Sequence, residues 1–278
     1  MANFLKLLTN DKEIRIFLVE ATSLLEESEL KGMQTPLARQ LYANIFVNCC
    51  LLWGFLTEAG QRITVSFRFK PEGCLASGLI NWAGNVTCTF SSPLASFAGQ
   101  FADLAGEGAT LSITKGSRRE GVFTGTVELK APSIDACFSD FYTQSEQIKT
   151  IFRTWFEKGV ARGCLVQPLP FAGDERLKSV LERIDRAENY LVTGEWTALP
   201  SIVFPDAAIV EADDLRSGCI CSKEWFCSAL KTLETAELEK FIEAGETMEL
   251  ACGICGKRYE FSPAELEMIV GHKEKRGA

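Results

Sequence analysis

Histidine is nearly absent from this chain, since its 278 residues include only His272. A nucleophile activated by an imidazole needs a histidine beside it, and this sequence offers a single candidate for that role. A phosphate-cradling glycine loop is also missing, because Gly-Glu-Gly-Ala-Thr at 106–110 is typical of a turn. We therefore expect no catalytic site and a protein that is not an enzyme.

Positive charge and long apolar runs are scarce as well. The 29 Lys and Arg residues are outnumbered by 37 Asp and Glu residues, so the net charge of -8 argues against a nucleic-acid partner. The longest apolar segment, 41–56, has sixteen residues and contains Asn44 and Asn48. A membrane span needs about 20 apolar residues, so we expect a buried helix there and no membrane partner. The N-terminal stretch lacks the pattern of a signal peptide, which predicts a cytoplasmic protein.

The patterns that are present predict an α+β fold for residues 1–170. Thr35 and Pro36 are a favourable start for a helix that continues through the apolar segment. Apolar and polar residues then alternate, which indicates strands with one buried face in a mainly antiparallel sheet. The predicted strands lie at 62–69, 86–90, 111–113, 122–129 and 164–167.

Residues 171–217 are expected to form a linker that is partly helical. Asp174 can cap a helix that stops near Gly194 and carries apolar residues on one face, namely Leu177, Val180, Leu181, Ile184 and Leu191. The apolar stretch 199–215 follows, with two prolines and an acidic end. Two interpretations remain open: a connector that lies on the first domain, or a segment whose docking is conditional.

Residues 218–278 form a third region, which holds five of the eleven cysteines. Ser222, Thr235 and Ser262 are each placed to cap a short helix, and alternation around Met248 and Tyr259 predicts two strands. A unit of this size has a marginal hydrophobic core. It therefore usually needs a metal or a crosslink in order to fold.

Clustered cysteines suit a metal site, a disulfide or a thiol enzyme. In a reducing compartment permanent disulfides are rare, and Cys219, Cys221, Cys252 and Cys255 can supply the four thiolates of one tetrahedral Zn²⁺. Such a site is either inert scaffolding or a switch that unfolds when oxidation releases the metal. Cys227 is either a core residue or a resolving thiol. The other six are expected to be inert core residues: Cys49, Cys50, Cys74, Cys88, Cys137 and Cys164.

Five segments resemble one known family. CxCS at 219–222, SALKTL at 228–233 and CGIC at 252–255, followed by a YxF strand, resemble the C-terminal switch of the bacterial redox-regulated holdase chaperones, the thirty-three-kilodalton heat-shock family. GVFTGTVEL at 121–129, followed by FYTQSEQ at 141–147, resembles the N-terminal domain of the same family.

This resemblance implies a cytoplasmic, ATP-independent holdase that is inactive while zinc is bound. It implies that oxidants drive the disulfides Cys219–Cys221 and Cys252–Cys255, release the zinc and unfold first the switch domain and then the linker. The exposed apolar surface would then bind unfolding client proteins while the protein forms a homodimer. The expected parts are an N-terminal client-binding and dimerisation domain (1–170), a linker (171–217) and a zinc redox-switch domain (218–278).

Two other functions remain as alternatives. A structural zinc ribbon that binds nucleic acid or a protein partner would need a complementary surface on the small domain, and its lysines are interleaved with acids. A thiol oxidoreductase using CGIC would need that motif at a helix N-terminus in a thioredoxin-like setting, and the sequence places it at a strand turn.

Overall fold

The computed structural model describes residues 2–26, 29–117, 121–219, 221–231, 233–252 and 255–277, with only the backbone at 26, 29, 31 and 272–277. The chain forms two compact units, Met1–Gly218 and Cys219–Ala278. Within the described residues, the structure contains no helix long and apolar enough to cross a membrane.

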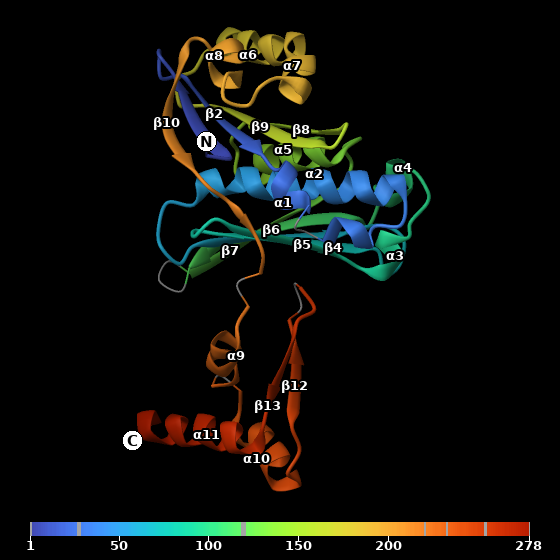
Figure 1. Ribbon diagram of the computed structural model, residues 1–278, viewed down its shortest axis with the longest axis vertical. Helices are drawn as coiled ribbons and strands as arrows, with labels where there is room; N and C mark the ends of the chain where they lie inside the picture. Colours follow the sequence, from blue (N-terminus) through green and yellow to red (C-terminus); the bar gives the residue numbers. More distant parts are fainter. Residues whose placement is uncertain are drawn as a thin grey trace. The chain divides into compact units, whose positions relative to one another are not determined.

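The first unit contains a five-stranded antiparallel sheet (Figure 1). Its strand order is β10-β1-β2-β9-β8, so the N-terminal hairpin lies in the middle of the sheet. The strands are β1 (Phe4–Thr9), β2 (Ile14–Glu20), β8 (Ile151–Glu157), β9 (Val160–Pro168) and β10 (Ala207–Asp213).

A six-stranded sheet forms the other layer of this unit. Its order is β11-β5-β4-β3-β6-β7, and every pair is antiparallel except β11 with β5. The strands are β3 (Arg62–Arg68), β4 (Leu75–Asn81), β5 (Asn85–Phe90), β6 (Thr110–Ser117), β7 (Gly121–Glu128) and β11 (Arg216–Ser217).

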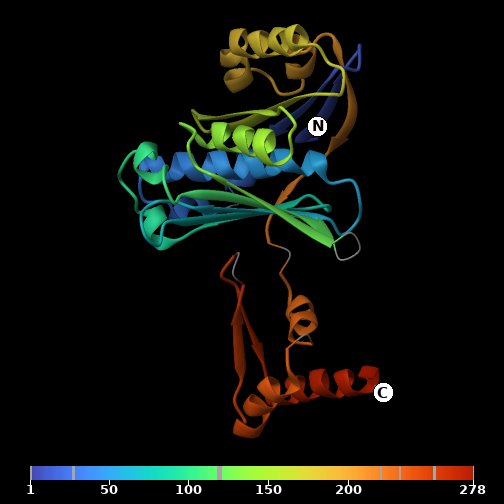
Figure 2. The same ribbon diagram turned by 180° about the vertical axis from the view of Figure 1, so that it is seen from behind.

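Two helices, α2 (Pro36–Leu52) and α5 (Ile134–Ser145), lie between the two sheets (Figures 1 and 2). The predicted start of α2 is confirmed, because the Thr35 side chain accepts a hydrogen bond from the Ala38 amide at 3.1 Å. The described part of this unit also contains five short helical segments: α1 (Thr22–Glu26), η1 (Glu29–Gly32), η2 (Trp53–Phe55), α3 (Ser92–Ala95) and α4 (Phe101–Leu104).

The glycine at the centre of GVFTGTVEL has a packing role. A Cβ atom on Gly125 would lie 2.1 Å from Ser145 Oγ and 2.8 Å from the Phe141 ring. Only glycine therefore lets β7 approach α5 this closely. This contact explains in physical terms why the strand and the helix after it belong to one motif.

Three helices cover the outer face of the five-stranded sheet, namely α6 (Asp174–Arg186), α7 (Glu188–Thr193) and α8 (Leu199–Val203) (Figure 1). The helix expected from Asp174 to Gly194 is interrupted at Ala187, and Asp174 is its first residue while Gly173 occupies the cap position. Its predicted apolar face is confirmed, since Leu177, Val180 and Ile184 are buried against the sheet. This cover creates a second hydrophobic core in the first unit.

Several strands were not predicted from the sequence. β1 and β2 lack clear alternation because one face packs on α2 and the other on α6–α8, so both faces are buried. The stretch 199–215 contributes β10, which pairs with β1, and β11 directly after it pairs with β5. This stretch therefore leads into an edge strand of each sheet.

The second unit is built from α9 (Lys223–Leu230), α10 (Thr235–Ala244), the hairpin of β12 (Met248–Ala251) and β13 (Arg258–Phe261), and α11 (Pro263–Gly277). The predicted strands and the cap at Ser222 are confirmed, and Ser262 forms a capping box with Glu265. Thr235 is the first helical residue, and Glu234 occupies the cap position instead. His272 lies on α11, and its side chain is outside the described residues.

Candidate metal centre

The structure brings together the four cysteines that the sequence analysis selects. The Sγ atoms of Cys219, Cys221, Cys252 and Cys255 all lie within 4.8 Å of one another. The Sγ atoms of Cys219 and Cys252 are 3.8 Å apart, and those of Cys221 and Cys255 are 3.3 Å apart. Cys252 is buried, and the other three are half-buried.

A tight turn between β12 and β13 presents two of these sulfurs. The Cys252 amide donates a hydrogen bond to the Lys257 carbonyl, and the Gly256 amide donates one to the Cys252 carbonyl, each at 2.8 Å. Gly256 has a φ of 71°, which favours glycine. The other two sulfurs, those of Cys219 and Cys221, come from the segment between β11 and the cap of α9.

Tyr259 on β13 joins the two halves of the cluster. Its hydroxyl lies 2.7 Å from the Cys221 carbonyl oxygen and 3.1 Å from the Cys221 Sγ atom, and it can donate to either. Its ring packs on Phe226 of α9, with the ring centres 5.0 Å apart. The alternation around Tyr259 predicts its strand, and it does not predict this contact. The YxF pattern after the second cysteine pair is the only signal that points to it.

The four sulfurs fit a metal ion by distance and by chemistry. Metal–sulfur bonds of about 2.3 Å in a tetrahedron place the sulfurs about 3.8 Å apart, close to the distances found. Burial raises the pKa of Cys219 and of Cys255. Four adjacent thiolates therefore need a bound cation to remain ionised in this position. The cluster could hold one metal ion.

The remaining cysteines lie outside this cluster. The six in the first unit are buried, as predicted for core residues, and burial raises the pKa of Cys137 to about 12. Such thiols are poor nucleophiles at neutral pH. Cys227 is half-buried on α9 and packs against the core of the small unit, and both interpretations of it, a core residue or a resolving thiol, stay open.

Comparison with known proteins gives consistent matches. The family model described as Hsp33 protein matches residues 3–262. A 33 kDa chaperonin from Latilactobacillus sakei subsp. sakei (strain 23K) is 29% identical over 295 residues, which cover 96% of this chain and 98% of that relative. One from Lactobacillus johnsonii (strain CNCM I-12250 / La1 / NCC 533) is 32% identical over 172 residues, which cover 58% of this chain and 59% of that relative.

The fold has a match among solved structures. The crystal structure of the 33 kDa chaperonin (heat shock protein 33 homolog) from Thermotoga maritima superimposes with a TM-score of 0.74 at 19% identity, covering 98% of this chain and 99% of that one. This similarity confirms the α+β fold class. Since the family model matches nearly the whole sequence, as the upstream and C-terminal motifs indicated, the chain belongs to the Hsp33 family.

Proposed function

We propose that this protein is a redox-regulated, ATP-independent holdase chaperone that is inactive when reduced and zinc-bound. Family membership, with relatives named 33 kDa chaperonins, supports the chaperone role. The single observation that carries the redox part is the cluster of four sulfurs in the small unit. A tetrahedral set of four thiolates is typical of structural Zn²⁺ sites.

The small unit depends on its metal for stability. Among its described residues the core contains nine buried ones, namely Phe226, Leu230, Leu238, Met248, Cys252, Tyr259, Phe261, Leu266 and Ile269. Structural zinc contributes about 10–16 kcal/mol of apparent binding free energy to domains of this kind. Loss of the four thiolates would therefore unfold the unit.

Oxidation removes the four thiolates by converting them into disulfides. Two thiolates form one disulfide, and their two electrons pass to a peroxide, which takes up two protons and leaves as two waters. We propose that the pairs are Cys219–Cys221 and Cys252–Cys255, so two peroxides consume all four ligands. When bound, zinc supplies the positive charge that holds the thiolates together.

The segment 171–217, which belongs to the first unit, would then transmit the change to the rest of that unit. Gly218 directly precedes Cys219, and the Gly218 amide donates a hydrogen bond to the Val86 carbonyl at 2.8 Å, beside the two-residue pairing of β11 with β5. This pairing is short enough to be lost when the following chain unfolds. Release of β10 and α6–α8 would expose the apolar outer face of the five-stranded sheet.

We propose this exposed face as the site that holds unfolding client proteins. A homodimer in the oxidised state, a cytoplasmic location and the absence of nucleic-acid and membrane partners belong to the same proposal. A structural zinc ribbon that binds a partner is the alternative, and it predicts no response to oxidants.

The test combines three measurements on the full chain before and after hydrogen peroxide at elevated temperature. These are zinc content, free thiols and aggregation of a thermally unfolding client enzyme. We expect one zinc per chain to be released as four thiols disappear, and aggregation to be suppressed only after oxidation. The variant Cys252→Ser should lack zinc even without oxidant. The matched control Cys227→Ser changes a cysteine outside the cluster and should keep its zinc. The proposal would be refuted if zinc stayed bound after oxidation, or if the holding activity were the same before and after oxidation.

A further inference from the structure

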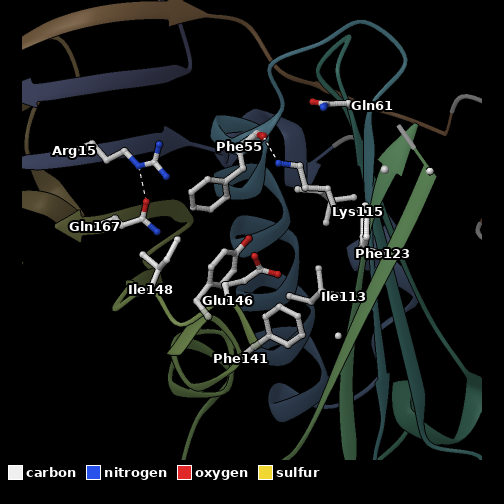
Figure 3. A pocket seen from close by; sticks show the side chains of 15 residues that line it. Arg15, Phe55, Gln61, Ile113, Lys115, Phe123, Phe141, Glu146, Ile148 and Gln167 are labelled. Atoms are coloured by element: carbon white, nitrogen blue, oxygen red, sulfur yellow. Dashed lines mark hydrogen bonds between the residues drawn. The ribbon is translucent and has the colours of Figure 1, made fainter. Parts of the chain in front are cut away.

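A cavity of about 480 Å³ opens in the first unit, between the ends of the two sheets. Figure 3 shows Arg15 and Gln167 on the wall from the five-stranded sheet, with Lys115 and Phe123 on the facing wall from the six-stranded sheet. Phe141 of α5 also lines it. Pockets of about 300–1,000 Å³ with a few placed polar groups are typical small-ligand sites.

Arg15 is held in a fixed orientation at this cavity. Its Nε atom donates a hydrogen bond to Gln167 Oε1 at 2.6 Å, and Gln167 Nε2 donates one to Thr150 Oγ1 at 2.6 Å. The Arg15 guanidinium also lies over two rings, 5.0 Å from the centre of Phe55 and 5.5 Å from that of Phe17. These contacts position the cation before any ligand arrives.

No anion inside the described part of the chain neutralises Arg15. Every ion pair found there joins other residues, and no hydrogen bond is found for the two terminal guanidinium nitrogens of Arg15. Burial lowers the pKa of Arg15, as expected for a guanidinium that is desolvated with no carboxylate beside it. A guanidinium in this state is an open binding group for an anion.

The charged groups of the cavity lining favour the binding of one anion. Lys115 is a second cation, and its Nζ atom donates a hydrogen bond to the Phe55 carbonyl at 2.8 Å. Glu146 is the one acidic residue of the lining and forms no ion pair with either cation within the described residues. The lining therefore carries one net positive charge.

Aromatic rings and isoleucine side chains make up the apolar part of the cavity. Phe55 and Phe141 line it, and Phe123 lies at its edge with 76% of its surface exposed. Ile148, 42% exposed, is a further uncovered apolar side chain of the lining. Large side chains left this exposed gain free energy when an apolar group covers them.

We infer that this cavity binds an apolar group that bears a carboxylate. The carboxylate accepts hydrogen bonds from the terminal nitrogens of Arg15, and the apolar body packs against Phe55, Phe123 and Phe141. Two sources present this chemistry: a free organic acid, or the C-terminal carboxylate of an unfolded chain that ends in an apolar residue. No lining residue belongs to the segment 171–217, so the inference does not rest on the proposed redox switch.

The first test compares 3-phenylpropionate with its neutral analogue 3-phenylpropionamide on the full reduced protein. Binding is followed by ligand-observed NMR. We expect the acid to bind at least about tenfold more tightly, because hydrogen bonds to charged groups are stronger than neutral ones. Equal binding of acid and amide, or no binding of the acid at millimolar concentration, would overturn the inference.

Variants assign the effect to the named residues. Arg15→Gln should weaken acid binding about tenfold or more and leave amide binding unchanged. Arg68→Gln is the matched control, since Arg68 is exposed at the opposite end of β3 from the cavity lining. Phe123→Ala alters an exposed residue that the fold does not need, and it should weaken acid and amide equally. Unchanged acid binding in Arg15→Gln would refute the role of Arg15.

Short peptides that end in Leu-Phe separate the two sources. A free C-terminal carboxylate that binds in an Arg15-dependent way, with loss of binding on amidation, identifies chain ends as ligands. Binding of 3-phenylpropionate alone identifies a free organic acid. Each outcome supports the carboxylate site and names its source.

Discussion

The Sγ atom of Cys221 lies 3.3 Å from the Sγ atom of Cys255, so a close sulfur contact joins the two halves of the cluster. Cys219 faces Cys252 in the same way, at 3.8 Å. The folded cluster therefore places each cysteine beside a partner from the other sequence pair. All four sulfurs are nevertheless within 4.8 Å of one another, so geometry alone permits either pairing.

We predict that peroxide oxidation yields the local disulfides Cys219–Cys221 and Cys252–Cys255. Loss of the metal unfolds the unit, and closure of a short loop then costs less entropy than closure of a loop of about thirty residues. Peptide mapping by mass spectrometry without reductant measures the pairing. Linked peptides that join Cys221 to Cys255 would show instead that oxidation outpaces unfolding.

We predict that Tyr259→Phe weakens zinc binding about 10–100-fold, the usual effect of removing a group that orients a ligand. The change deletes only the hydroxyl near the Cys221 carbonyl and sulfur, and it keeps the ring that packs on Phe226. Competition with a chromophoric chelator gives the affinity. Tyr190→Phe, in the first unit, is the control. Equal affinities would mean that the turn and the helix cap orient Cys221 without help.

We predict that Arg162→Met loosens the cover of the five-stranded sheet. Arg162 pairs with Glu20, and its guanidinium donates hydrogen bonds to the carbonyls of Leu191 at 3.0 Å and Gly194 at 2.8 Å. Removal of one partner of a buried pair costs about 3–5 kcal/mol, so amide exchange in α7 should be faster by a hundredfold or more. Hydrogen exchange with mass spectrometry measures this.

Arg186→Met is the matched control for that experiment, because Arg186 forms an exposed pair with Glu182 on the same cover. Exposed ion pairs contribute little to stability, so the amide exchange rates of Arg186→Met should stay close to those of the parent protein. Similar rates in both variants would show that apolar packing alone holds α7.

We predict that docking of α6 weakens only in acid. Hydrogen bonds from Arg183 and from Arg176 hold the pKa of Asp206 well below its usual value of 3.8. A lowered folded-state pKa means that the stabilisation is fully present above the unfolded value and is lost as the pH falls through the folded value. The stability difference between the parent and Asp206→Asn should be constant above about pH 5 and shrink below 3.8.

Thermal unfolding of both proteins across this pH range provides the measurement. Other carboxylates titrate in both proteins alike, so only the difference between them reports on Asp206. A stability difference between the two proteins that does not change with pH would mean that the negative charge of Asp206 does not contribute to its interaction with the arginines.

Local chemistry accounts for what could be predicted from the amino-acid sequence. The cap at Thr35, the capping box at Ser262 and the spacing within each of the two cysteine pairs depend on residues a few positions apart, so the local sequence is enough to indicate them. The same holds for strands such as β3, where one face is buried and alternation is visible. The metal cluster and the fold class are of this kind.

The other features depend on contacts between residues that are far apart in the sequence. β1 and β2 are buried on both faces, so they show no alternation, and their burial follows from helices more than a hundred residues away. The hydrogen bond between Arg15 and Gln167 spans 152 positions, and the cavity beside it exists only because two sheets end at the same place. The contact of Tyr259 with Cys221 likewise needs the hairpin to fold beside α9. Side chains far apart in a chain become neighbours only through packing of whole elements, and no local pattern records that packing.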